Sequence, residues 1–208
     1  MARKTREEAM ETREKLLESA LEVMSEKPFS KVSMNEIAER IGLSKGAVYW
    51  HFKNKDDLLI NLVEAICGEG KDDLGARGAD FDSWNDLRLY FCGEMKKSIA
   101  NDRYKRLSML MQRKVEWPRD VQERIFSLGR AWDKTERNMV ENVMGKMLAG
   151  GAVREDVRTD EIAALITAIF RGLMISQFLG FFSMDIEKQV SFIFDSFSEQ
   201  LRPGKADI

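Results

Sequence analysis

Proline is scarce in this chain, with three among 208 residues, whereas Leu, Met, Ala, Glu, Lys and Arg are abundant. Proline breaks helices and the abundant residue types favour them. The composition therefore predicts an all-α fold. The length allows a small helical domain joined to a larger one.

Cysteine and histidine are also scarce. Cys67 and Cys92 lie far apart, and His51 is the single histidine. A zinc site or a disulfide framework needs such residues in clusters or regular spacings. We therefore expect no metal, no cofactor and a reducing cytoplasmic location. The segment 1–6 also lacks the apolar stretch of a secretory signal.

No charge of one sign dominates, because the formal net charge is −2 at pH 7. A protein that coats nucleic acid indiscriminately would need a chain-wide basic field, so any DNA-binding surface has to be local. The sequence also shows no paired histidines, Cys–His arrangement, glycine-rich phosphate loop or metal-spaced cluster. We expect that the protein is not an enzyme, and an all-helical enzyme is the less favoured alternative.

Only one long hydrophobic run is present, at residues 163–182, and its length matches a membrane span. Arg171 lies near its centre, where insertion into a bilayer costs roughly 2.5–3.5 kcal/mol. We favour a helix buried on several sides, in a core and a subunit interface, over a membrane anchor.

Apolar residues recur at helical spacing from residue 16 to residue 24, and this first helix is expected to end near Lys27-Pro28. The next start signal is Ser33 followed by Glu36, which has the S-x-x-E form of a capping box. It predicts a second helix over residues 34–40.

A tight bend should follow, because Gly42 can adopt the left-handed conformation that ends a helix. Ser44 can cap a short third helix over residues 45–50, and Asn54 or Lys55 begins a fourth. The glycine-rich stretch 68–78 loosens or ends the fourth helix. Helical periodicity returns over residues 84–99, 104–115, 121–148, 160–182 and 185–201. In all, about nine helices are expected, with a domain of residues 1–60 and a second of residues 61–208.

Two short helices joined by a glycine bend are what a helix-turn-helix requires. The segment from Arg40 to Lys55 contains four basic residues and no acid. Slim, polar and basic residues of the third helix can enter a major groove, while apolar residues pack the pair together. The predicted packing residues are Ile37, Ala38, Ile41, Leu43 and Val48, and the predicted groove face is Ser44, Lys45, Gly46, Ala47 and Tyr49.

The run from Gly42 to Leu58, GLSKGAVYWHFKNKDDL, closely resembles the TetR family of one-component regulators. Residues 2–5 and 11–13 resemble the AcrR-type multidrug-efflux repressors within that family. The resemblance implies an N-terminal three-helix DNA-binding domain and a larger helical domain for ligand binding and dimerisation. It also implies a homodimer on double-stranded operator DNA.

Site residues follow from the same resemblance. Ser44, Lys45, Gly46 and Tyr49 resemble recognition-helix contacts, although Lys45 stands where arginine is often found. The remaining positions would lie at the DNA backbone. Lys55 resembles a phosphate clamp that opens the fourth helix, and Ser33 resembles a backbone contact from the second helix. Trp50 and His51 would lie close to the backbone. A role for His51 as a pH sensor or catalytic base is the alternative. Phe52 is expected to pack the domain.

Broad apolar stripes on the segments 160–182 and 185–201 exceed what one small domain buries, so the two helices are expected to pair with their symmetry mates in a four-helix bundle. The middle helices are rich in Met and Trp, whose adaptable packing suits a hydrophobic or amphipathic ligand, although ordinary core is the alternative. The predicted ligand-binding residues are Leu87, Phe91, Ser108, Met111, Gln112, Trp132, Met139, Phe170 and Met174.

These features predict a ligand-responsive transcriptional repressor, with control of a multidrug-efflux or similar transport operon as the expectation from the resemblance. The alternatives are regulation of a metabolic operon, activation in place of repression, or an interaction protein that no longer binds DNA.

Overall fold

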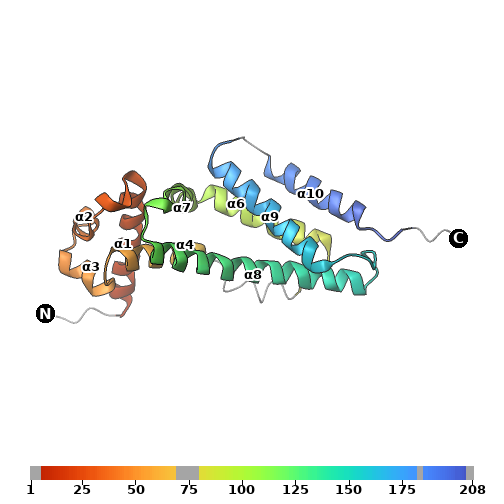
Figure 1. Cartoon of the computed structure of the whole chain (residues 1–208), viewed down its shortest axis with the longest axis horizontal. Helices are drawn as coiled ribbons and strands as arrows, with labels where there is room; N and C mark the ends of the chain where they lie inside the picture. The colour runs from red at the N-terminus through yellow and green to blue at the C-terminus, as the bar shows by residue number, and fades with distance from the viewer. Residues whose placement is uncertain (1–5, 69–79, 182–184, 205–208) are drawn as a thin grey trace. The chain divides into compact units, whose positions relative to one another are not determined.

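A computed structural model describes residues 6–68, 80–181 and 185–204. Residues 2–5 of the predicted resemblance, the stretch 69–78 and the end of the hydrophobic run at residue 182 lie outside these ranges. Within the described residues the chain forms α-helices, two 3-10 turns and no strand, which confirms the predicted all-α fold (Figure 1).

The helices keep the predicted order (Figure 1). The 3-10 turns, η1 (Phe29–Lys31) and η2 (Lys114–Glu116), precede α2 and α8. Nine helices lie in the described ranges: α1 (Arg6–Glu26), α2 (Met34–Arg40), α3 (Lys45–His51), α4 (Lys55–Gly68), α6 (Trp84–Ala100), α7 (Asp102–Gln112), α8 (Arg119–Ala149), α9 (Thr159–Phe178) and α10 (Ile186–Gln200).

The predicted end of the eighth helix at residue 182 was wrong, because this helix, α9, ends at Phe178. Gly180 adopts a left-handed φ of +68°. Its amide donates to the carbonyl of Gln177 at 3.1 Å, and the Phe181 amide donates to that of Ser176 at 3.1 Å. This glycine turn satisfies carbonyls at the helix end and stops the helix.

The chain forms two compact units. The first contains Met1–Glu69 with Asp102–Leu128, and the second contains Gly70–Asn101 with Gly129–Ile208. In the first unit α1 contacts α2, α4 and α7, and α4 contacts α7. Its core consists largely of fully buried leucines on α1 and α4, among them Leu16, Leu17, Leu58 and Leu62. The predicted limits of 1–60 and 61–208 divide the chain by function, into a DNA-binding domain and a domain for ligand binding and dimerisation. They stay a prediction.

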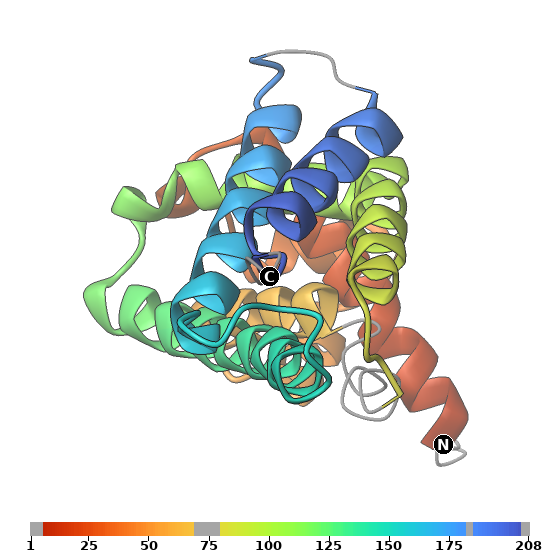
Figure 2. The same ribbon diagram turned by 90° about the vertical axis from the view of Figure 1, so that its right-hand side faces the viewer.

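In the second unit α6 packs against α9 and α10, and Figure 2 shows the three helices side by side. Three stacked phenyl rings join them. The Phe91 and Phe170 centroids lie 4.2 Å apart, and those of Phe170 and Phe194 lie 5.4 Å apart. Four residues of α9 are buried, including Ile166 and Phe170. Within the described residues α9 alone is long and apolar enough to cross a membrane, and these buried residues identify it as a core helix.

Candidate nucleic-acid interface and ligand site

Serine side chains fix the starts of the two short helices. Ser33 Oγ accepts a hydrogen bond from the Glu36 amide at 3.2 Å, and Ser44 Oγ accepts one from the Ala47 amide at 3.3 Å. Both predicted N-caps are thereby confirmed. The Glu36 carboxylate, however, accepts a hydrogen bond from Lys27 Nζ instead of completing the predicted capping box.

The bend between α2 and α3 depends on one glycine. Gly42 has a φ of +69°, a conformation that residues other than glycine rarely adopt. Its amide donates to the Glu39 carbonyl at 3.0 Å, and the Leu43 amide donates to the Ala38 carbonyl at 2.9 Å. These bonds close the end of α2 and set the direction in which α3 begins.

Buried side chains hold α3 in place. Ile37, Ala38 and Val48 are fully buried and Phe52 is almost fully buried, as predicted. The Ser19 hydroxyl of α1 donates to the Ile37 carbonyl at 2.8 Å within this core. The predicted packing residues Ile41 and Leu43 are half-buried. This packing leaves the opposite side of α3 exposed.

The exposed side of α3 and its start gathers most of the predicted groove face, with Ser44, Lys45, Gly46 and Tyr49 all exposed. Lys45 Nζ lies 5.8 Å from the centre of the Tyr49 ring. The neighbouring Trp50 is 72% exposed. A slim, cationic and aromatic surface of this kind suits a major groove.

The remaining predicted DNA contacts lie around this face. His51 is half-buried and meets the Trp50 ring edge-on at a centroid distance of 4.5 Å. Ala47 is half-buried, and Ser33 is exposed at the start of α2. Each therefore has some surface available to a contact with DNA.

Arg40 does not belong to an acid-free surface, contrary to the sequence prediction. Its two terminal nitrogens each lie 2.8 Å from an oxygen of Glu26, and Glu22 lies 3.5 Å away. The hydrogen bond lowers the pKa of Glu26 and raises the pKa of Arg40. These acids come from α1, which is distant in sequence, so Lys45 and Lys53 supply the exposed positive charge near α3.

Lys55 at the start of α4 has a structural role that the sequence did not indicate. Its Nζ donates to the carbonyls of Phe29 at 2.6 Å and Val32 at 3.1 Å. It also lies 4.3 Å from the centre of the Phe29 ring. Two of the three ammonium N–H groups thereby hold the 3-10 turn that leads into α2, and one remains for a phosphate.

The predicted ligand-binding residues divide between the units. Four of them, Leu87, Phe91, Met139 and Phe170, are buried together in the core of the second unit, and Met174 packs against that core. Trp132 is half-buried in the same unit. The other three lie on α7 in the first unit, with two half-buried and one exposed: Ser108, Met111 and Gln112.

A polar cluster in the second unit was missed by the sequence reasoning. Arg171 Nη1 lies 2.6 Å from Asp133 Oδ1, and Nη2 lies 4.0 Å from Glu136 Oε2. The Tyr90 hydroxyl donates to Glu136 Oε1 at 3.1 Å. The sequence did offer a signal for this cluster. Asp133 and Glu136 are three residues apart and so share one face of their helix, and Arg171 is the one charged residue within the apolar run 163–182.

The described residues contain no group of His, Cys, Asp or Glu side chains that could hold a metal ion. Their distinctive surface is instead the exposed α3 face, presented by a glycine bend on an all-helical chain. This arrangement defines a helix-turn-helix DNA-binding regulator.

Residues 16–62 match the family model "Bacterial regulatory proteins, tetR family". Over 196 residues the chain is 30% identical to the HTH-type transcriptional regulator AcrR of Shigella flexneri. The aligned region covers 91% of this chain and 88% of the relative. The chain therefore belongs to the TetR family of bacterial regulatory proteins. The resemblance predicted from the sequence is confirmed, and the members of this family are transcription regulators and not enzymes.

Two further relatives extend over nearly the whole chain. One is the probable acrEF/envCD operon repressor of Escherichia coli K12, with 24% identity over 209 residues, covering 99% of this chain and 93% of the relative. The other is the crystal structure of NalD, the secondary repressor of the MexAB-OprM multidrug efflux pump in Pseudomonas aeruginosa. It has a TM-score of 0.77 and 21% identity, covering 98% of this chain and all of that one, which shows a common fold.

Proposed function

We propose that this protein is a cytoplasmic, ligand-responsive repressor that binds operator DNA as a homodimer and controls an efflux or similar transport operon. The observation that carries the proposal is the exposed α3 face, held outward by the Gly42 bend and two serine caps. The names of two relatives, an operon repressor and a repressor of a multidrug efflux pump, support the choice of regulated genes.

In this proposal Ser44, Lys45, Gly46, Ala47 and Tyr49 meet base edges, since they lie at the start and on the outer side of α3. Arginine and lysine read guanine through its O6 and N7 atoms, and Lys45 is the basic residue of this face. Contacts to phosphates position the protein without reading sequence. We assign these to Ser33, Trp50, His51 and Lys55. We add Lys53 as a further phosphate contact, because it is exposed directly after α3.

Dimerisation through α9 and α10 is the second part of the proposal. Both helices carry large apolar side chains that the described part of the chain leaves largely exposed, with Leu165 48% exposed, Ile175 49% and Phe192 71%. Exposed apolar surface of this kind is typical of a protein interface. A two-fold dimer would present two copies of α3 to successive major grooves about 34 Å apart, or at a multiple of that spacing.

The third part is a ligand bound within the second unit, by the predicted residues of α6, α8 and α9: Leu87, Phe91, Trp132, Met139, Phe170 and Met174. The stacked rings of Phe91 and Phe170 favour an apolar or aromatic ligand. The charged cluster around Arg171 offers polar groups in the same unit. If ligand and DNA favour different conformations, each weakens the binding of the other by the same factor.

The proposal is tested with the full-length protein and labelled fragments from upstream of its own gene and of neighbouring transporter genes. We expect tight, salt-sensitive binding to a palindromic fragment, weakened by Tyr49→Ala and relieved by at least one compound of a hydrophobic drug and dye panel. Tyr104→Ala, on α7, is the matched control for loss of a tyrosine. Absence of binding to any fragment at low ionic strength refutes DNA binding, and unchanged affinity across the panel refutes ligand relief.

A reporter assay separates repression from activation. Deletion of the gene should raise expression from the bound promoter if the protein is a repressor and lower it if it is an activator. Binding upstream of a metabolic operon, and not a transporter operon, would contradict the proposed gene class while leaving the DNA-binding assignment intact.

A further inference from the structure

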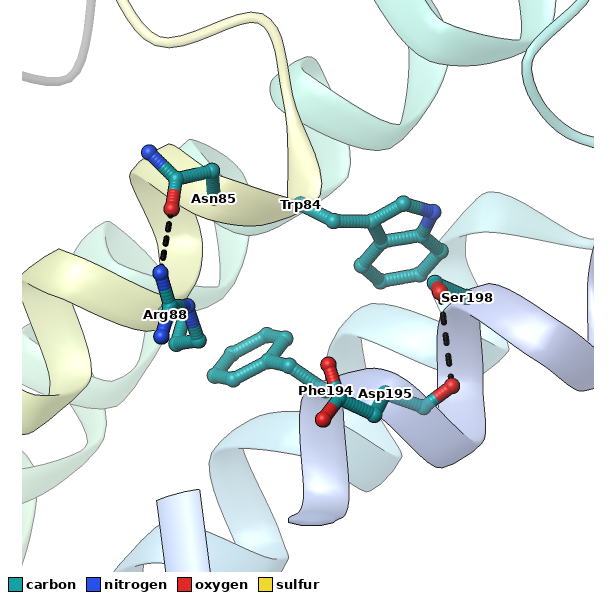
Figure 3. Close-up of a pocket in the computed structure, with 6 residues that line it drawn as sticks. All are labelled: Trp84, Asn85, Arg88, Phe194, Asp195 and Ser198. Carbon is teal, nitrogen blue, oxygen red and sulfur yellow. Dashed lines mark hydrogen bonds between the residues drawn. The ribbon is translucent and has the colours of Figure 1, made fainter. Parts of the chain in front are cut away.

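A pocket of about 360 Å³ lies between α6 and α10, within the second unit. Figure 3 shows Trp84, Asn85 and Arg88 of α6 facing Phe194, Asp195 and Ser198 of α10. None of the nine ligand-binding residues predicted from the sequence lines this pocket. It is therefore a different site from the proposed effector site in the core.

Aromatic rings form part of the pocket wall. The Trp84 indole lies nearly parallel to the Phe197 ring, with an interplanar angle of 14° and a centroid distance of 6.3 Å. The centroids of Trp84 and Phe194 are also 6.3 Å apart. Phe194 is almost fully buried and stacks on Phe170. These contacts fix an indole and a phenyl ring at the pocket, and a flat aromatic guest can lie against them.

Two opposite charges also line the pocket. The Arg88 guanidinium donates to Asn85 Oδ1 at 2.6 Å and to the Ser191 hydroxyl at 3.5 Å, which are both neutral acceptors. The exposed Asp195 carboxylate has no ion pair within the described part of the chain, and none joins it to Arg88. In Figure 3 the two side chains come from different helices with no bond drawn between them.

This combination selects a ligand by its charge pattern. Arg88 attracts an anionic group but Asp195 repels it, and the reverse holds for a cation. A guest that carries both charges satisfies both side chains. The Ser198 hydroxyl, which donates to the Asp195 carbonyl at 3.3 Å, also offers its oxygen lone pairs to an ammonium group.

We propose that the α6–α10 pocket binds a small planar aromatic zwitterion, with its carboxylate on Arg88, its ammonium on Asp195 and its ring against Trp84. The volume supports a molecule with one ring system, because 360 Å³ lies near the lower end of the range of about 300–1,000 Å³ for ligand pockets. The proposal does not depend on DNA binding, so it can fail or succeed separately from the proposed function.

Calorimetric titration of the full-length protein tests the charge pattern with three probes that share one indole ring. These are L-tryptophan as the zwitterion, N-acetyl-L-tryptophan as the anion and L-tryptophan methyl ester as the cation. We expect the zwitterion to bind at least about tenfold more tightly than either singly charged probe, since each of them loses one charge-assisted hydrogen bond. Equal affinities, or no binding at millimolar concentrations, would overturn the proposal.

Two substitutions should invert the preference. In Arg88→Gln the cation should bind as tightly as the zwitterion, and in Asp195→Asn the anion should do so. Matched controls in the same unit, Arg130→Gln on α8 and Glu199→Gln on α10, should retain the original order because neither residue lines the pocket. Asp195 is exposed, so its variant keeps the test decisive if Arg88→Gln does not fold. An unchanged order in Asp195→Asn refutes the assignment.

Discussion

Gly46 offers the sharpest test of the proposed DNA-binding face. It is the second residue of α3, and its φ is not among the positive values that the described glycines show. A Cβ added there would meet its nearest side-chain atom, Ser44 Oγ, at 3.8 Å, which is an ordinary van der Waals contact. The fold therefore accommodates alanine at this position without strain.

Gly46→Ala should stabilise the protein and weaken its binding to DNA. Replacing a helical glycine by alanine is worth about 0.5–1 kcal/mol of unfolding free energy. If α3 lies in the groove at this residue, the added methyl group separates its backbone from the DNA. We expect at least about tenfold weaker operator binding, or about 1.4 kcal/mol.

Thermal melting by circular dichroism and fluorescence anisotropy with labelled operator measure the two effects. Gly145→Ala is the matched control, because Gly145 lies within α8 with nothing within 4 Å of an added Cβ. It should raise stability similarly and leave operator affinity unchanged. If Gly46→Ala binds operator as tightly as the wild type, α3 does not approach DNA at this residue and the proposed interface is wrong.

Three further changes probe other parts of the structure. Lys55→Met removes the hydrogen bonds to the Phe29 and Val32 carbonyls and should lower the unfolding free energy by about 1–2 kcal/mol; an unchanged melting curve would show that these bonds contribute nothing. Ser83→Ala removes the N-cap of α6 and should cost about 1 kcal/mol at neutral pH. The Ser83 hydroxyl and backbone amides lower the pKa of Asp86 below its ordinary value of 3.8. The stabilisation by ionised Asp86 is therefore complete above that value and is lost as pH falls through the folded-state pKa. The difference in unfolding free energy between Ser83→Ala and the wild type should shrink in acid, and denaturant titrations at several pH values measure it. Leu165→Arg should convert the dimer to monomer in light-scattering measurements, and a persistent dimer would exclude this α9 surface from the interface.

The sequence predicted those features of the DNA-binding region that depend on neighbouring residues. Ser33, Ser44 and Gly42 act through bonds to residues at most five positions away, so their roles could be recognised from local spacing alone. The starts of α2, α3 and α4 and the burial of Ile37 and Ala38 were correct for the same reason. Local hydrogen bonding and periodicity do not require knowledge of the tertiary fold.

Contacts between distant residues could not be predicted in this way. The partners of Arg40 lie 14 and 18 positions away, and those of Lys55 lie 23 and 26 positions away. The α6–α10 pocket joins residues about a hundred positions apart. Periodicity shows that such helices have a buried face, but it does not show which helices meet or which charges face one another.

The dependence of operator affinity on salt tests the central claim most directly. A protein that neutralises DNA phosphates shows a linear fall of log K with log salt concentration, with a slope of about −0.9 for each phosphate neutralised. We expect a steep slope for the wild-type dimer, reduced in magnitude by about 0.9 per subunit in Lys53→Gln, while the control Lys97→Gln on α6 leaves it unchanged. Binding that is insensitive to salt, or a slope that Lys97→Gln lowers as much as Lys53→Gln does, would contradict the assignment of the α3 region as the DNA-binding surface.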